Sequence, residues 1–156
     1  MYAFLLIVHS WLRWVVLIAG LTAFVGAVIG MVDKRPFSTL NNRAGLIFTV
    51  TFDLQLLIGL LLYFVFSPLV RVVLQDFGGA MGSSALRFFA LEHSLMMLAA
   101  LVLAHIGRAR IRQASSDSQK HRRGLIFYGT AVLLLIAAIP WPFLEWGRVL
   151  FRFGLG

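Results

Sequence analysis

The chain alternates four long apolar segments with shorter polar ones. The apolar segments cover residues 3–31, 44–66, 86–106 and 125–139. Because a bilayer with a hydrocarbon core of about 30 Å takes roughly 20 apolar residues per helix, each segment is interpreted as a membrane-spanning helix. The pattern therefore predicts a single all-α domain over residues 1–156, an up-and-down bundle of four transmembrane helices.

Polar and turn-forming residues separate these segments. Connections 32–43 and 107–124 are short and basic, whereas connection 67–85 is longer and rich in glycine. The first part of the longer connection, residues 69–77, is expected to form a short interfacial helix. The sequence Pro-Trp-Pro at 140–142 ends the fourth helix, because proline lacks the backbone N–H that a helix interior needs.

Composition supports a membrane protein and excludes several kinds of site. Hydrophobic residues make up 60% of the chain and charged residues 13%, against about 45–50% and about 25% in soluble domains. The net charge of +8 does not indicate a nucleic-acid partner, because the cations crowd into the short connections. The absence of cysteine excludes disulfides, iron–sulfur clusters and attached c-type haem.

The basic residues also predict the orientation of the bundle. Connection 32–43 holds three basic residues and one acidic residue, and connection 107–124 holds six and one. The positive-inside rule places both connections in the cytoplasm. Both chain termini are then expected on the outer, periplasmic side, with the aromatic residues that follow the fourth helix at the outer interface.

Six ionisable side chains lie within the apolar segments, where each needs a partner or a function. They are His9, Arg13, Asp53, Glu92, His93 and His105. With a helical rise of about 1.5 Å per residue, His9 and His93 both lie about 8–9 Å below the outer ends of their helices. Each also lies at the outer end of a helix face lined with small residues, and such faces turn toward other helices in membranes. The matched pair predicts that His9 and His93 ligate the iron of one haem b from opposite faces.

Other roles for these residues are weighed against ligation. One alternative is that each histidine is a hydrogen-bonded residue of the bundle interior. Zinc is disfavoured because it takes three or four ligands, and Glu92 points about 100° away from His93. His105 lies about 18 Å deeper than His93 and has no deep histidine on another helix to pair with. A structural role is expected for it rather than a second haem.

Arg13 has several candidate partners. Its depth near the bilayer midplane matches that of Asp53, and an ion pair between the two is the favoured interpretation. The Arg13 side chain also leans toward the outer end of its helix, where it would reach Glu92 or the propionates of a haem. Arg87 is a further candidate for a propionate. No catalytic residue is predicted; the predicted cofactor-binding residues are His9, Arg13, Arg87 and His93, with His9 and His93 as metal ligands.

Several motifs in these segments resemble one family. They are "HSWLRW" at 9–14, "DLQ" before "GLLLYF" at 53–64, "EHSLMM" at 92–97, and "IPWPF" followed by "GR" at 139–148. Over nearly its whole length the chain resembles small four-helix bacterial membrane proteins of the cytochrome b or cytochrome b-like type. The resemblance implies haem-based electron transfer in the bacterial cytoplasmic (inner) membrane, beside a respiratory or photosynthetic redox complex. The histidines of two of these motifs are again His9 and His93.

Three functions are compatible with the sequence. The favoured one is a haem b electron-transfer protein, an accessory subunit rather than a stand-alone enzyme, because bis-histidine iron has no free position for a substrate. The alternatives are a haem-free structural subunit of a larger membrane complex, and a proton or ion conduit using Arg13, Asp53, Glu92 and His93. The expected partners are membrane lipid and other redox subunits, without nucleic acid; quinone is left open, since no quinone pocket can be read from the sequence.

Overall fold

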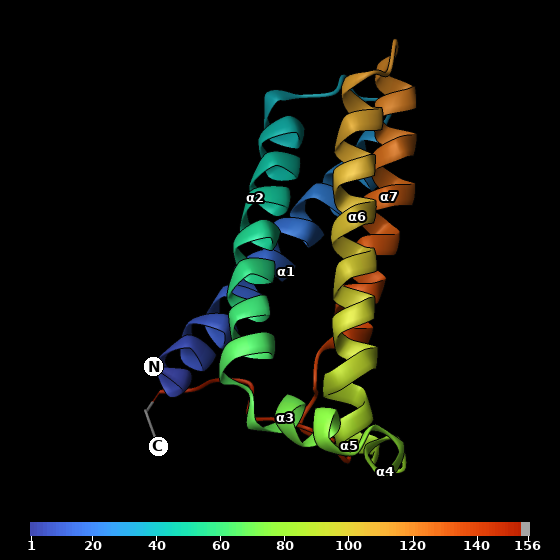
Figure 1. Ribbon diagram of the computed structural model, residues 1–156. Helices are drawn as coiled ribbons and strands as arrows, with labels where there is room; N and C mark the ends of the chain where they lie inside the picture. Colours follow the sequence, from blue (N-terminus) through green and yellow to red (C-terminus); the bar gives the residue numbers. More distant parts are fainter. Residues whose placement is uncertain (154–156) are drawn as a thin grey trace.

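A computed structural model describes residues 1–153 of the chain (Figure 1). Its long helices are α1 (Tyr2–Val32), α2 (Thr39–Leu61), α6 (His93–Arg112) and α7 (Asp117–Ala138). The short helices α3 (Pro68–Gln75), α4 (Phe77–Met81) and α5 (Ser84–Arg87) lie between α2 and α6. Two π-helical turns, η1 (Leu62–Phe66) and η2 (Phe88–Glu92), extend α2 and join α5 to α6. The described part of the chain contains no strand.

Four helices are long and apolar enough to cross a membrane. They are Tyr2–Val32, Thr39–Phe66, Ser84–Arg112 and Asp117–Ala138. The predicted all-helical fold, with four helices long and apolar enough to span a membrane, is therefore confirmed, and the short helix predicted at 69–77 is present as α3.

The helices extend further than predicted at the basic end of the bundle. The connections shrink to residues 33–38 and 113–116, so most cations of the predicted second connection lie on the ends of α6 and α7. Serine caps explain two of the new starts. The hydroxyls of Ser38 and Ser116 accept hydrogen bonds from the first turns of α2 and α7, which satisfies backbone N–H groups that have no partner within the helix.

Figure 1 shows both short connections at one end of the bundle. The helices α3, α4 and α5 lie at the opposite end, together with the N-terminus and the segment that follows α7. Helix α1 crosses the bundle obliquely, so its N-terminal half diverges from α6 and α7.

Small residues allow the helices to pack closely in the other half of the bundle. A Cβ atom on Gly20 would come within 2.8 Å of Cε2 of Phe48, which is itself fully buried. Ala23 and Ala27 of α1 and Ala100 and Ala104 of α6 are buried as well. The stripes of small residues predicted to face other helices are therefore confirmed.

Candidate functional site

A cavity of about 460 Å³ opens where α1 diverges from the bundle. Its walls come from α1, from the end of α2 with η1, from η2 with the start of α6, and from the end of α7. Most lining side chains are aliphatic or aromatic, with a few polar groups among them. A largely apolar cavity of this size is typical of small-molecule and cofactor sites, which span about 300–1,000 Å³.

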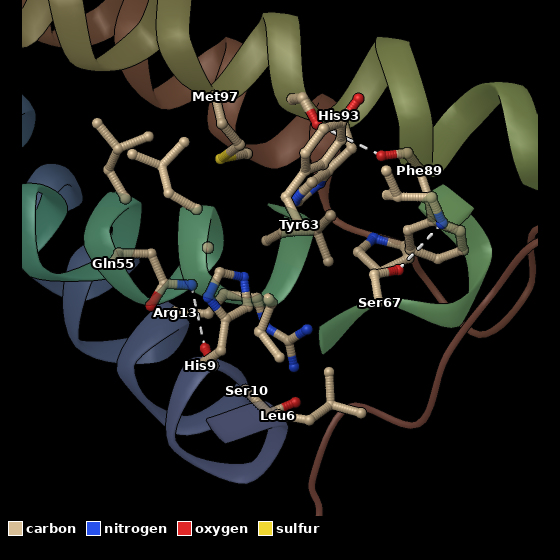
Figure 2. A pocket seen from close by; sticks show the side chains of 18 of the residues that line it. Leu6, His9, Ser10, Arg13, Gln55, Tyr63, Ser67, Phe89, His93 and Met97 are labelled. Carbon is tan, nitrogen blue, oxygen red and sulfur yellow. Dashed lines mark hydrogen bonds between the residues drawn. The ribbon is translucent and has the colours of Figure 1, made fainter. Parts of the chain in front are cut away.

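His9 and His93 face one another across this cavity. Their ring centroids lie 6.4 Å apart, with the ring planes inclined by 66°. Figure 2 shows His9 entering from α1 and His93 from α6, with Arg13 beside His9 and Met97 on the same helix as His93. The two histidines therefore lie at the same level of the bundle, whereas their depth in the membrane stays a prediction.

Each imidazole has a different hydrogen-bonding environment. Nδ1 of His93 lies 2.8 Å from the carbonyl oxygen of Ala138, so this nitrogen carries the proton and donates it. Nε2 of His93 is then left with a free lone pair. Nδ1 of His9 is buried without a hydrogen-bond partner among residues 1–153. Such an orphan is rare for a buried polar atom and calls for a ligand or another explanation.

The backbone around His9 is fixed from α2. Nε2 of Gln55 donates to the carbonyl oxygen of His9 at 3.0 Å, and Gln55 is itself buried. Gly59, one turn further along α2, lies beside the imidazole, and a Cβ there would make an ordinary contact with Cε1 of His9 at 3.4 Å. Neither Gln55 nor Gly59 was predicted from the sequence to belong to the site.

The π-helical turn η2 positions His93. The backbone N–H of His93 bonds to the carbonyl of Phe88, five residues earlier, and the rings of Phe88 and Phe89 pack against His93. The hydroxyl of Tyr63 in η1 donates to the carbonyl of Ala90 at 2.8 Å. Two π-turns therefore meet at the cavity, and single π-turns within helices are frequent at functional sites.

The predicted ion pair between Arg13 and Asp53 is wrong. Nη2 of Arg13 donates to the carbonyl oxygen of Leu150 at 2.6 Å, and Arg13 lines the cavity. Asp53 instead lies 2.8 Å from Nε2 of His105 on α6. The oblique path of α1 is the physical reason, because equal depth does not bring the facing sides of α1 and α2 together at Arg13.

Arg87 is not among the residues that line the cavity. Its Nε atom forms an ion pair with Glu92 at 2.7 Å, and Nη1 donates to the carbonyl of Met81. Glu92 is likewise absent from the lining. The structure thus brings His9, Arg13 and His93 together and leaves out Arg87, the fourth predicted residue.

Two arginines that the sequence analysis did not select do line the cavity. Arg148 and Arg152 belong to the segment after α7, where no helix forms. They could have been found as two cations four residues apart in an otherwise apolar stretch with one acidic residue, Glu145. Because they lie in a segment without a helical pattern, the sequence did not indicate that their side chains reach the cavity.

Comparison of the chain with known protein families, with characterised proteins and with solved structures gives no match. Membership of the cytochrome b-like family therefore stays a prediction.

The donor atoms at the site favour some metal centres over others. No group of three or more histidine or acidic side chains able to hold a metal ion occurs within residues 1–153. Zinc takes three or four protein ligands, so the cavity does not offer a zinc site. Two facing imidazoles fit a metal whose remaining ligands come from a macrocycle.

Proposed function

We propose that the chain is a membrane-embedded haem b protein that transfers electrons, with His9 and His93 as the two axial ligands of one iron. The observation that carries the proposal is the facing pair of imidazoles in an otherwise apolar cavity. The motifs that contain the two histidines, at 9–14 and 92–97, resemble those of cytochrome b-like proteins, which also supports haem binding.

The separation of the two rings supports axial ligation. A metal–imidazole bond is about 2.0–2.1 Å long, and the ring centroid lies about 1.2 Å behind the nitrogen, so two imidazoles that would hold one metal from opposite sides have centroids about 6.4–6.6 Å apart. The ring centroids of His9 and His93 are 6.4 Å apart. His9 and His93 would hold the iron, which would supply one-electron chemistry.

The surroundings of the two rings also fit this role. Ligating histidines almost always donate their second ring N–H to a carbonyl or a carboxylate, which fixes the tautomer and the ring orientation. Nδ1 of His93 does so toward Ala138. Nδ1 of His9 is buried without a partner within residues 1–153, so this histidine has an unused nitrogen for a ligand.

The residues around the pair bind, orient and exclude water. Bound haem supplies one-electron chemistry, and ligation of iron by two histidines leaves no open position for a substrate. Gln55 holds the backbone of His9, and Phe88 and Phe89 shield His93 from the end of the bundle. This arrangement supports an electron relay rather than an oxygenase.

We further propose that the protein lies in a bacterial cytoplasmic membrane as an accessory subunit of a redox complex. The cations gathered at one end of the bundle support an orientation with that end in the cytoplasm. The connections 33–38 and 113–116 are too short to carry a catalytic domain. This role needs partner subunits to supply and accept electrons.

A reduced-minus-oxidised absorption spectrum tests the proposal. The chain would be expressed in bacteria supplied with a haem precursor and purified in mild detergent. We expect a Soret band that shifts and sharpens on reduction, with resolved α and β bands, and the loss of this spectrum in His9→Ala and in His93→Ala. His121→Ala is the control, because His121 is buried near the opposite end of the bundle against the carbonyl of Arg35.

Two outcomes would overturn the proposal. The first is purified protein without a Soret band despite haem supply, which would favour the haem-free structural subunit. The second is a spectrum that survives both histidine substitutions. The variant Met97→Leu separates histidine–histidine from histidine–methionine ligation, since Met97 is another donor in the lining, and we expect it to keep the spectrum.

A further inference from the structure

Three cations lie in the same cavity as the histidine pair. Arg13, Arg148 and Arg152, here called the arginine cluster, all line it. The ion pairs of the described residues involve other side chains, so no carboxylate of residues 1–153 lies within 4.0 Å of a nitrogen of this cluster. Arg13 and Arg152 are half-buried and Arg148 is exposed; burying part of a guanidinium beside an apolar cavity is costly unless a negative charge accompanies it.

The segment after α7 is held in place from two sides. On one side, Nε1 of Trp11 donates to the carbonyl of Arg152 at 2.9 Å, and Arg13 donates to the carbonyl of Leu150. On the other side, the ring of Trp146 stacks on that of Phe88 at 5.1 Å. Figure 1 shows this segment crossing the end of the bundle from α7 to the N-terminus. The two arginines that it carries are therefore part of the cavity wall.

The cluster flanks both histidines. Arg13 lies one helical turn from His9 on α1 and points into the cavity beside it (Figure 2). The guanidinium of Arg148 lies 5.0 Å from the ring centroid of Phe89, whose ring neighbours that of His93. A ligand held between the two imidazoles would meet cations on the side of the segment after α7.

Arg13 keeps unused donors for such a ligand. A guanidinium has five N–H groups. One nitrogen of Arg13 donates to Leu150, and Nε is buried without a partner within residues 1–153. The planar guanidinium matches a carboxylate with two parallel hydrogen bonds. The cluster thus suits carboxylate groups on a flat apolar ligand.

We infer that the arginine cluster binds the two carboxylates of the porphyrin, so that the segment after α7 completes the cofactor site. This inference rests on the proposed function. It assigns a binding role to Arg148 and Arg152, and it replaces Arg87 as the predicted propionate partner with residues from the far end of the chain.

Haem and its dimethyl ester, in which both carboxylates are blocked, test the inference. The apoprotein in detergent is titrated with each compound, and the Soret band reports binding through the histidines in both cases. We expect the wild-type protein to prefer haem over the ester by about 10- to 100-fold, since hydrogen bonds to charged groups are worth that much. In the double variant Arg148→Gln/Arg152→Gln the preference for haem over the ester should nearly disappear. What remains should match the difference with which the two compounds partition into detergent alone.

Arg71→Gln is the matched control. Arg71 is exposed on α3, at the same end of the bundle, and donates to the carbonyl of Val65 outside the cavity lining. This variant should keep the wild-type preference for haem. The wild-type comparison of haem with its ester needs no variant, so it tests the contact with the carboxylates even if the double variant fails to fold.

The outcomes separate this inference from the proposed function. Wild-type protein that binds haem and the ester equally would refute the carboxylate role while leaving the axial ligands intact. Wild-type protein that binds neither compound would refute the proposed function. Equal loss of haem and of ester binding in a double variant that keeps the thermal stability of the wild type would mean that the segment only covers the cavity. A different result would assign the cluster to a phospholipid phosphate. In that case haem and its ester bind equally, and phosphatidylglycerol competes with haem whereas phosphatidylcholine does not.

Discussion

The side chain of Arg87 forms an ion pair with Glu92, five residues further along the same helix, with 2.7 Å between Nε and Oε1. Residues five apart in an α-helix lie about 140° apart around the axis. The π-turn η2 between them adds one residue to the turn and brings the two side chains to the same face. This ion pair holds the side chain of Arg87 outside the cavity.

Replacement of Arg87 should therefore have little effect on the cofactor. We expect Arg87→Ala to retain the haem spectrum and the affinity for haem. Its free energy of unfolding should fall by at most about 1 kcal/mol, as for other solvent-accessible ion pairs. Haem titration and thermal unfolding in detergent measure the two effects. A strong loss of haem affinity would contradict the placement of Arg87 outside the site.

Much of the fold could be predicted because a membrane helix needs a long apolar segment and has a regular rise per residue. Apolar length predicted the four long helices, and helical rise alone predicted that His9 and His93 lie at the same level of the bundle. The ends of the helices were less predictable, because serine caps at Ser38 and Ser116 extend them into segments rich in charge.

The remaining site residues depend on features that a regular helix pattern does not contain. The uniform turn of about 100° per residue that the prediction assumed does not hold across η2. As a result Arg87 and Glu92 pair with each other, which the sequence did not predict. The oblique path of α1 separated Arg13 from Asp53. Arg148 belongs to a segment without regular structure, whose position is set by hydrogen bonds from α1 and ring stacking on η2. None of these three features has a periodic signal in the sequence.

The contact between Asp53 and His105 should stabilise the bundle without affecting the cofactor. The two side chains are 2.8 Å apart and about half exposed, midway along α2 and on the facing side of α6. We expect Asp53→Asn and His105→Ala each to lower thermal stability in detergent. The coupling energy in a double-mutant cycle should be about 0.5–2 kcal/mol, as for other interhelical hydrogen bonds in membranes.

The same variants separate this contact from the haem site. The reduced-minus-oxidised spectrum should be unchanged in both, because neither residue lines the cavity. Loss of the spectrum in His105→Ala alone would mean that His105, and not His9 or His93, ligates the iron.

The orientation of the bundle can be tested directly because the chain contains no cysteine. Single cysteines would be placed at Gln75, which ends α3, and at Ser115 in the connection between α6 and α7; both positions are exposed. In intact cells we expect a membrane-impermeant maleimide to label Gln75→Cys and not Ser115→Cys. After permeabilisation both variants should react. Labelling of Ser115→Cys alone in intact cells would reverse the orientation inferred from the positive-inside rule.

The size of residue 59 should decide whether His9 can act as a ligand. A Cβ at Gly59 would make an ordinary contact with the imidazole, so Gly59→Ala should keep the low-spin spectrum. The longer side chain of Gly59→Leu would enter the space of the ring, and overpacking of this kind costs about 1–3 kcal/mol, so haem affinity should fall by about tenfold or more. Gly45→Ala is the control for general damage, because its methyl group would overlap the hydroxyl of Tyr128 away from the cavity. That variant should lose thermal stability and keep its haem affinity, whereas unchanged haem affinity in Gly59→Leu would show that His9 does not hold the iron.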